Sequence, residues 1–147
     1  MRLDHDWIAA HVPHQGRMCL LDTVLNWNPT LIECSAGSHR ATDHPLRAHG
    51  RLGAASLIEY AAQAMAVHAA LLESPTSDAA RRAAPRIGML TSVRSMELKV
   101  AELDALQGDL SIRAERLHGD VRGALYVFHI RCAGELVAQG RASVLLT

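Results

Sequence analysis

The segment 54–73 limits the possible folds of this chain more than any other feature. It consists of strong helix formers without glycine or proline, which predicts one long helix. That helix is apolar nearly all round, so we expect other elements to surround it. Glu59, Gln63 and His68 interrupt the apolar run. The segment therefore falls short of a membrane span, and no membrane partner is expected.

Most of the remaining chain has the pattern of strands. Between residues 121 and 132, the apolar residues Tyr126, Phe128 and Ile130 recur at every second position, as they do when one face of a strand is covered. About six antiparallel strands can bury one long helix only if the sheet curls around it. The sequence predicts an α+β protein with a hotdog fold, a single domain spanning residues 1–147. The expected strands are 18–27, 30–37, 87–100, 106–117, 121–132 and 136–146.

Three further segments connect or precede these elements. Asp4 or Asp6 is a suitable N-cap for a short helix that ends at about His11. Residues 38–53 have no sustained period and are expected to form a loop of functional length. Residues 74–85 have the composition of a surface connection.

The composition excludes several classes of function. Fifteen basic and fifteen acidic side chains give no net charge, which argues against nucleic-acid binding because phosphate neutralisation needs a basic excess. Cys19, Cys34 and Cys132 form no Cys-x-x-Cys pair, so they predict neither a disulfide framework nor a zinc site and read as small core residues. Asp4 and Asp6 stand where an export signal would be apolar. We therefore expect a cytoplasmic protein.

Two stretches carry candidate chemistry. The first reads His44-Pro-Leu-Arg-Ala-His49-Gly and leads into the helix, where Glu59 and Gln63 are four residues apart. The second reads Val12-Pro-His-Gln-Gly-Arg-Met-Cys-Leu-Leu-Asp-Thr-Val24. Together they resemble the hotdog-fold 3-hydroxyacyl-acyl carrier protein dehydratases, and the helix is most similar to the dehydratase-like proteins of aryl polyene biosynthetic clusters.

This resemblance implies a hydro-lyase that converts 3-hydroxyacyl-acyl carrier protein thioesters to 2-enoyl thioesters without a metal or organic cofactor, in fatty acid or polyene biosynthesis. The reaction needs a base for the C2 proton and an acid for the departing hydroxyl. His44 is the expected base and His49 the reserve, because alignment on Glu59 leaves the register of the loop open. Glu59 is the expected acid, kept protonated by its apolar surroundings.

Residues near the start of the predicted helix could assist the expected acid and base. Backbone N–H groups at the start of the helix, at Gly53 and Ala54, are candidates to bind the thioester oxygen. Gln63 lies one helical turn after Glu59 and could orient its carboxyl group.

The candidate site residues can also be explained by structural roles that involve no catalysis. Taken without the family resemblance, Glu59 would be a buried carboxylate paired with Arg51 or Arg94. His68 is expected to pack inside the protein. The intervals of the loop histidines match no usual ligand spacing, so no metal site is expected among His39, His44 and His49.

Partners and alternative functions complete the expectations. The resemblance implies an acyl carrier protein as partner and a homodimer or heterodimer in which His44 of one chain faces Glu59 of the other. The segment 87–100 is the expected edge strand of that dimer. A local basic patch could dock the acidic carrier or be a solvated face; its members are Arg47, Arg51, Arg81, Arg82 and Arg86. The alternative functions are a hotdog acyl thioesterase and a non-catalytic partner subunit of a heterodimeric dehydratase.

Overall fold

The computed structural model describes residues 2–12, 14, 16–73, 88–120 and 122–146. Two α-helices, three short 3₁₀ helices and six strands make up this part of the chain. In chain order they are α1 (His5–His11), η1 (Gly16–Met18), β1 (Thr23–Asn28), β2 (Leu31–Ala36), η2 (Ser38–Arg40), η3 (Ala54–Ser56), α2 (Leu57–Glu73), β3 (Gly88–Leu98), β4 (Leu110–Gly119), β5 (Gly123–Cys132) and β6 (Glu135–Leu146).

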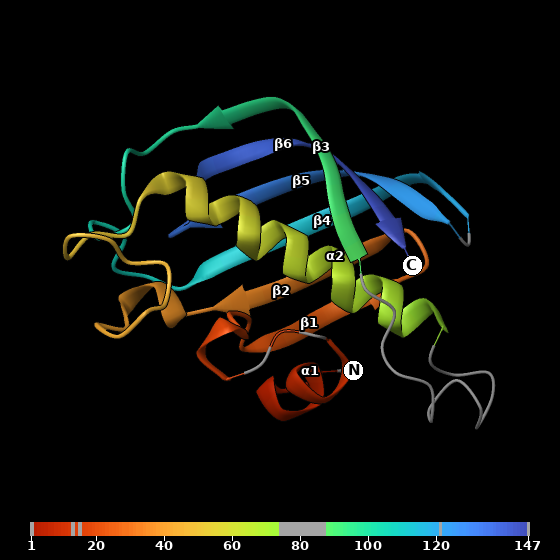
Figure 1. Cartoon of the computed structure of the whole chain (residues 1–147), viewed down its shortest axis with the longest axis horizontal. Coiled ribbons are helices and arrows are strands. Elements are labelled where there is room, and N and C mark those ends of the chain that lie inside the picture. The colour runs from red at the N-terminus through yellow and green to blue at the C-terminus, as the bar shows by residue number, and fades with distance from the viewer. Residues whose placement is uncertain (1, 13, 15, 74–87, 121, 147) are drawn as a thin grey trace.

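The six strands form one antiparallel sheet in the order β1-β2-β4-β5-β6-β3. Helix α2 lies across one face of this sheet, and β3 passes over the helix at the sheet's edge (Figure 1). Helix α1 lies beside β1 (Figure 1). The single long helix wrapped by a curved antiparallel sheet confirms the predicted hotdog fold.

The core fills the space between α2 and the sheet. Strand β4 alternates between buried and exposed residues over its first half, and β5 has the same period with buried Tyr126, Phe128 and Ile130. This period places one face of each strand against the helix. The three cysteines are free thiols and are buried, as expected for small core residues.

The observed elements differ from the predicted ones at a few boundaries. Asp4 caps α1 by accepting a hydrogen bond from the Trp7 N–H, as predicted. Strand β1 begins at Thr23 instead of residue 18, because Met18 and Leu20 are bonded to helix α2 and not to a neighbouring strand. Strand β4 begins at residue 110 instead of 106. The predicted connection 74–85 lies outside the described residues.

The two edges of the sheet differ in how they are covered. At one edge, Leu3 exchanges backbone hydrogen bonds with Val24 of β1. At the other edge lies β3, as predicted for the segment 87–100. Leu90 and Leu98 on β3 are 39% and 41% exposed. An edge strand with exposed leucines is a surface suited to pairing with another chain.

Among the described residues, one helical stretch is long and apolar enough to cross a membrane. It is Ala54–Glu73, the stretch that includes η3 and α2. Half of this stretch is buried within the protein, and it is the helix that packs against the sheet.

Candidate functional site

Glu59 is the centre of a three-residue cluster on α2. Its Oε1 atom is 3.1 Å from Nε2 of His14 and accepts a hydrogen bond of 3.3 Å from the Gln63 amide. The side chains of Glu59 and His14 are 34% and 25% exposed. The Glu59 carboxylate and the His14 ring are therefore partly open to solvent in the single chain.

Gln63 ties the N-terminal segment to this cluster. It is completely buried, and its amide nitrogen donates to the Met18 carbonyl at 2.6 Å while its Oε1 accepts from the Leu20 N–H at 2.8 Å. The i, i+4 spacing puts Gln63 on the same side of α2 as Glu59. The contact predicted between these two side chains is present, and the same amide holds the chain that carries His14.

The electrostatics of Glu59 differ from the sequence-based expectation. A hydrogen bond with His14 is the main cause that lowers the pKa of Glu59, and Gln63 lowers it further, whereas burial alone would raise it. The prediction of a carboxyl group kept protonated by apolar surroundings is therefore wrong for this chain. Pairing with Arg51 or Arg94 is not observed either, since Glu59 has a histidine partner and Arg51 lies 3.9 Å from Glu102.

His44 is buried, and both nitrogens of its ring have partners within the chain. The Leu46 N–H donates to Nδ1 at 3.1 Å, which leaves the proton of the neutral ring on Nε2, 3.1 Å from the Tyr60 hydroxyl. Tyr60 is in turn 2.7 Å from the Ser38 hydroxyl. Burial is the main cause that lowers the pKa of His44. In the neutral ring both nitrogens are therefore engaged within the chain, one with Leu46 and one with Tyr60.

His49 occupies a different environment from His44. It is exposed and lies in the tight turn formed by residues 48–51, where Ala48 and Arg51 exchange backbone hydrogen bonds. Its φ of 54° and the φ of 75° at Gly50 are those of a type I′ turn. Within the described residues, no hydrogen bond or ion pair joins either His44 or His49 to Glu59. One chain alone does not bring these predicted partners together.

The start of the helix offers fewer free N–H groups than predicted. The Ala54 N–H donates to the Ala101 carbonyl at 3.0 Å, so it is not available for a substrate oxygen. The isolated bridge between Gly53 and Glu102 is made by the Ala54 and Leu103 N–H groups, so it does not use the Gly53 N–H. The proposed donor role of Ala54 is thus incompatible with this backbone geometry.

The sequence reasoning did not select His14 as a site residue. His14 was part of a stretch noted for its family resemblance, and no local spacing connects it with a residue 45 positions later. The only local sign of a site residue was that His14 is polar and follows a proline in a segment without the alternating pattern of a strand. Its contact with Glu59 depends on how Gln63 holds the N-terminal segment.

The described residues contain no group of three or more His, Cys, Asp or Glu side chains that could hold a metal ion. His39 is completely buried, with Nε2 2.9 Å from the Leu106 carbonyl. The three loop histidines therefore have separate surroundings: His39 and His44 have internal partners, and His49 is exposed.

Two arginines of the predicted basic patch, Arg47 and Arg51, lie beside carboxylates. Arg47 forms an ion pair with Asp104, and Arg51 lies beside Glu102. These carboxylates balance much of the positive charge that the two arginines bring to the loop. The remaining members, Arg81, Arg82 and Arg86, lie outside the described residues.

Known proteins that resemble this chain share its fold and include dehydratases. The family model named ApeP-like, described as ApeP dehydratase, matches residues 7–147. The dehydratase heterocomplex ApeI:P from Xenorhabdus doucetiae has a TM-score of 0.79 and 23% sequence identity, covering 95% of this chain and 90% of that chain. No curated protein matches.

Thioesterases are also among the similar structures. A hypothetical thioesterase protein with coenzyme A from Streptococcus pneumoniae TIGR4 has a TM-score of 0.58 and 14% identity, covering 84% of each chain. A mutant thioesterase enzyme from Staphylococcus aureus subsp. aureus Mu50 has a TM-score of 0.56 and 15% identity, covering 84% of this chain and 91% of that chain. At these identities the structures establish a common fold.

Proposed function

The chain belongs to the ApeP-like dehydratase family, and from this premise we propose that it removes water from 3-hydroxyacyl thioesters carried by an acyl carrier protein. We further propose that the reaction needs no metal or organic cofactor. The observation that carries the proposal is the partly exposed Glu59 carboxylate, which His14 and Gln63 hold through one oxygen. A fixed carboxylate at the surface of an apolar helix is suited to proton transfer from a bound substrate.

The second oxygen of Glu59 is the reacting atom in this proposal. Oε1 is occupied by His14 and Gln63, whereas Oε2 has no partner among the described residues. Oε2 accepts the proton from C2, and the electrons of the C2–H bond form the new C2–C3 double bond as the C3–O bond breaks. The proton is then transferred to the departing hydroxyl, which leaves as water, and Glu59 returns to its carboxylate form. One carboxyl group thus serves first as the base and then as the acid.

His14 and Gln63 act in this scheme as positioning residues. Their hydrogen bonds fix the carboxylate and favour its ionised form, which is the form needed for proton abstraction. The thioester oxygen is assigned to the first turn of the helix, at Gly53 and Ala55, because the Ala54 N–H is already bonded.

The proposal assigns His44 a structural role instead of the base role implied by the resemblance. Its ring would have to give up the bond from Leu46 before Nδ1 could accept a substrate proton. His44 and the Tyr60 hydroxyl hold the loop against α2, close to the residue that precedes Tyr60 in the helix, Glu59. His49 stays the exposed histidine that a partner chain could use.

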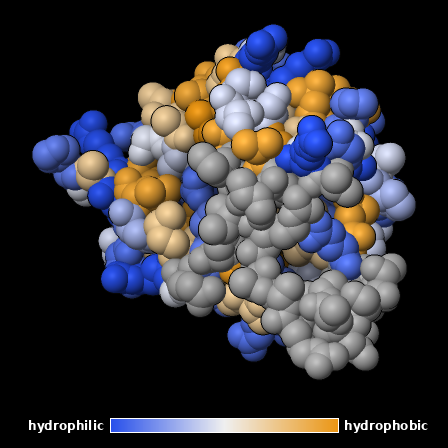
Figure 2. Space-filling view, turned by 45° about the vertical axis from the view of Figure 1, so that its right-hand side comes forward, coloured by the Kyte–Doolittle hydropathy of each residue, from blue (hydrophilic) through white to orange (hydrophobic). Residues whose placement is uncertain are grey.

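We also propose that the chain works in a dimer formed through β3, with a homologous dehydratase chain as the partner. The support is the uncovered edge with exposed Leu90 and Leu98, and the similar ApeI:P structure is described as a dehydratase heterocomplex. Hydrophobic residues are exposed between hydrophilic ones on the face shown in Figure 2. A partner chain paired with β3 would cover Leu90 and Leu98.

The test of the proposed function is the Glu59→Gln variant. The amide keeps the shape of the side chain but accepts no proton, so dehydration is expected to fall by a factor of roughly 10² to 10⁴. Loss of water from 3-hydroxyacyl carrier protein is followed by mass spectrometry, with Glu135→Gln at the exposed start of β6 as the matched control. A folded Glu59→Gln protein that dehydrates at the original rate would refute the assignment.

The same assay separates the alternative functions. Release of free thiol without the 2-enoyl product would identify a thioesterase. Activity that appears only after addition of a homologous dehydratase chain would identify a partner subunit, and light scattering on the protein alone measures whether it forms a homodimer. Mixing His44→Ala chains with Glu59→Gln chains tests a site shared between protomers. Recovery of activity in confirmed mixed dimers would restore His44 as a base.

A further inference from the structure

Tyr60 follows Glu59 in helix α2, and its side chain is completely buried. Its hydroxyl lies 2.7 Å from the Ser38 hydroxyl and 3.1 Å from Nε2 of His44. Burial raises the pKa of Tyr60 to about 12, so the hydroxyl keeps its proton at neutral pH. The dehydration proposed above uses neither this hydroxyl nor Ser38. A connected network of buried polar groups fixes the positions of the segments that it joins.

The direction of each hydrogen bond in this network follows from the number of protons available. The Ser38 hydroxyl has one proton and donates it to the Leu20 carbonyl at 2.8 Å. Ser38 therefore accepts from the Tyr60 hydroxyl, and Tyr60 accepts from Nε2 of His44. The donors form a one-way chain that runs from the loop, through the helix, to the Leu20 carbonyl.

Leu20 is held through both of its backbone groups. Its N–H donates to Oε1 of Gln63 at 2.8 Å, and its carbonyl accepts from Ser38, which is bonded in turn to Tyr60. Gln63 follows Tyr60 by three residues, an interval that places both on one side of α2. The helix therefore fastens the N-terminal segment at two points, one direct and one through Ser38.

The segment fastened in this way carries the partner of Glu59. His14 precedes Leu20 by six residues, and its Nε2 lies 3.1 Å from Oε1 of Glu59. His14 and Gln63 are the groups whose contacts lower the pKa of Glu59. Within the part of the chain that the structure describes, the Tyr60 hydroxyl has no bond to Glu59, so its influence on the carboxylate passes through the segment that it holds.

We propose that Tyr60 and Ser38 are positioning residues for the Glu59–His14 pair. Together they fix the Leu20 carbonyl, and thereby the segment that brings His14 to the carboxylate. The inference rests on the proposed dehydratase function and adds to its site two residues that contact no reacting atom. Small displacements of the groups that orient a catalytic side chain are costly for turnover.

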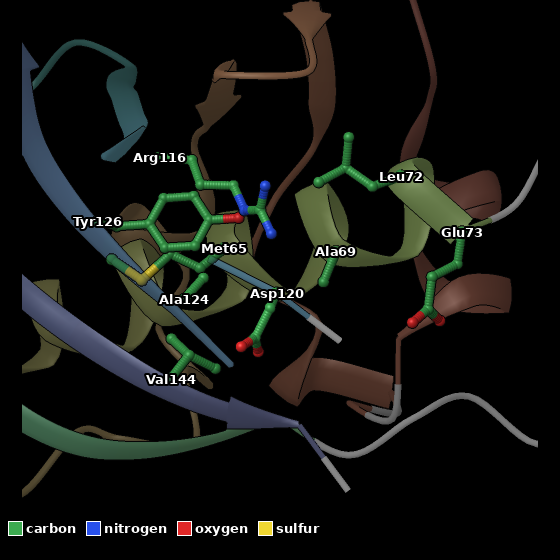
Figure 3. A pocket seen from close by; sticks show the side chains of 9 residues that line it. All are labelled: Met65, Ala69, Leu72, Glu73, Arg116, Asp120, Ala124, Tyr126 and Val144. Carbon is green, nitrogen blue, oxygen red and sulfur yellow. The ribbon is translucent and has the colours of Figure 1, made fainter. Parts of the chain in front are cut away.

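Tyr126 provides a matched control because it is the other tyrosine of the chain and is also buried. Its hydroxyl is 2.7 Å from Nδ1 of His68, and burial raises its pKa to about 12 as well. Tyr126 lines a cavity of about 330 Å³ between the C-terminal half of α2 and the sheet (Figure 3). Its hydrogen bonds lead through His68 to the Asn28 carbonyl, away from Leu20. Tyr126→Phe therefore removes a similar hydroxyl and leaves the network of Tyr60 intact.

The first test measures dehydration of 3-hydroxybutyryl carrier protein by the two phenylalanine variants. In Tyr60→Phe, kcat should fall about tenfold while KM changes less than about twofold. The acid limb of the kcat/KM profile should move to higher pH, because His14 is no longer held against Glu59. Tyr126→Phe should leave kcat and the acid limb in place. Equal changes in the two variants, or an unchanged Tyr60→Phe enzyme, would overturn the inference.

A second variant tests the chain of bonds and serves if Tyr60→Phe does not fold. Ser38→Ala should lower kcat and move the acid limb in the same direction as Tyr60→Phe. The double variant should lose no more than the stronger single variant, because both side chains act through the Leu20 carbonyl. Losses that multiply in the double variant would show that the two residues act independently and would overturn the proposed chain.

An NMR titration keeps this inference separate from the proposed chemistry. In protein labelled with ¹³C at the glutamate carboxyl groups, the signal of Glu59 is the one that is absent from Glu59→Gln. The pKa of Glu59 should rise in Tyr60→Phe and Ser38→Ala and stay in place in Tyr126→Phe. This pattern supports the positioning role even if Glu59→Gln dehydrates at the original rate. An unmoved Glu59 pKa in both Tyr60→Phe and Ser38→Ala would overturn it.

Discussion

The two ends of helix α2 each hold a hydrogen-bonded histidine, in contrasting surroundings. Near the N-terminal end, His14 contacts the partly exposed Glu59 at 3.1 Å. Nearer the C-terminal end, the completely buried His68 lies 2.7 Å from both the Tyr126 hydroxyl and the Asn28 carbonyl. The Asn28 carbonyl can only accept, so Nε2 of His68 carries the proton and Nδ1 accepts from Tyr126.

Different causes dominate the pKa shifts at the two ends of the helix. At Glu59 the hydrogen bond from His14 outweighs burial, and the pKa of Glu59 is lowered. At the other end burial is the main cause: it lowers the pKa of His68 and raises the pKa of Tyr126 to about 12. In the proposed reaction the first pair exchanges protons with a substrate, while the second is a buried structural pair.

The largest effect is expected from Gln63→Leu at the N-terminal end. This change leaves the Leu20 N–H and the Met18 carbonyl without their buried partner, which should cost about 3 kcal/mol of unfolding free energy. Chemical denaturation measures the loss, with Gln107→Leu in an exposed loop as the control. A loss below about 1 kcal/mol would mean that Gln63 does not fasten the N-terminal segment to α2.

A smaller effect is expected from His68→Phe at the other end. Phenylalanine fills a similar space but leaves the Tyr126 hydroxyl and the Asn28 carbonyl unpaired, at a cost of about 2 kcal/mol. Turnover of a 3-hydroxybutyryl substrate should not change in the folded variant, because His68 takes no part in the chemistry at Glu59. Loss of that turnover without loss of stability would contradict the division between the two ends.

His14→Gln sharpens the comparison through the pH profile of activity. The change removes the imidazole hydrogen bond that is the main cause lowering the pKa of Glu59, so that pKa should rise. The acid limb of the kcat/KM profile should then move to higher pH, while His118→Gln on the exposed end of β4 leaves it in place. An unmoved acid limb in His14→Gln would show that His14 does not set the ionisation of Glu59.

The smallest expected effect is on the pH dependence of the free energy of unfolding. The buried histidines and Glu59 should change it in different pH ranges. The pKa values of His39, His44 and His68 are lowered from 6.5, so the unfolded chain takes up protons first as the pH falls. Their contribution is complete above about pH 6.5 and is lost below it. The lowered pKa of Glu59 acts in a separate window, below its ordinary value of 4.5.

Chemical denaturation at about pH 7.5 and about pH 5.5 measures how much stability the three buried histidines contribute. The free energy of unfolding should fall between these two conditions, and the fall should be smaller in His68→Phe. A stability that rises toward pH 5.5 would contradict the neutral state assigned to the buried rings.

The sequence by itself determined the fold class and most of the elements. An apolar helix without glycine or proline has to be covered, and strands with one apolar face can cover it only as a curved sheet. Asp4 as a cap, β3 as an edge strand and the burial of His68 follow from local composition and period. Glu59 and Gln63 could also be placed together, because their contact depends only on helical spacing.

Only the tertiary structure decided the chemistry of these residues. The partner of Glu59 is His14, which reaches it because Gln63 binds Met18 and Leu20 far away in the chain. The pKa of Glu59 is lowered because that contact outweighs burial. Burial is likewise the main cause that lowers the pKa of His44, and its Nδ1 atom accepts a hydrogen bond from the Leu46 N–H. Protonation depends on the balance of burial and neighbouring donors, and that balance exists only after distant segments have packed together.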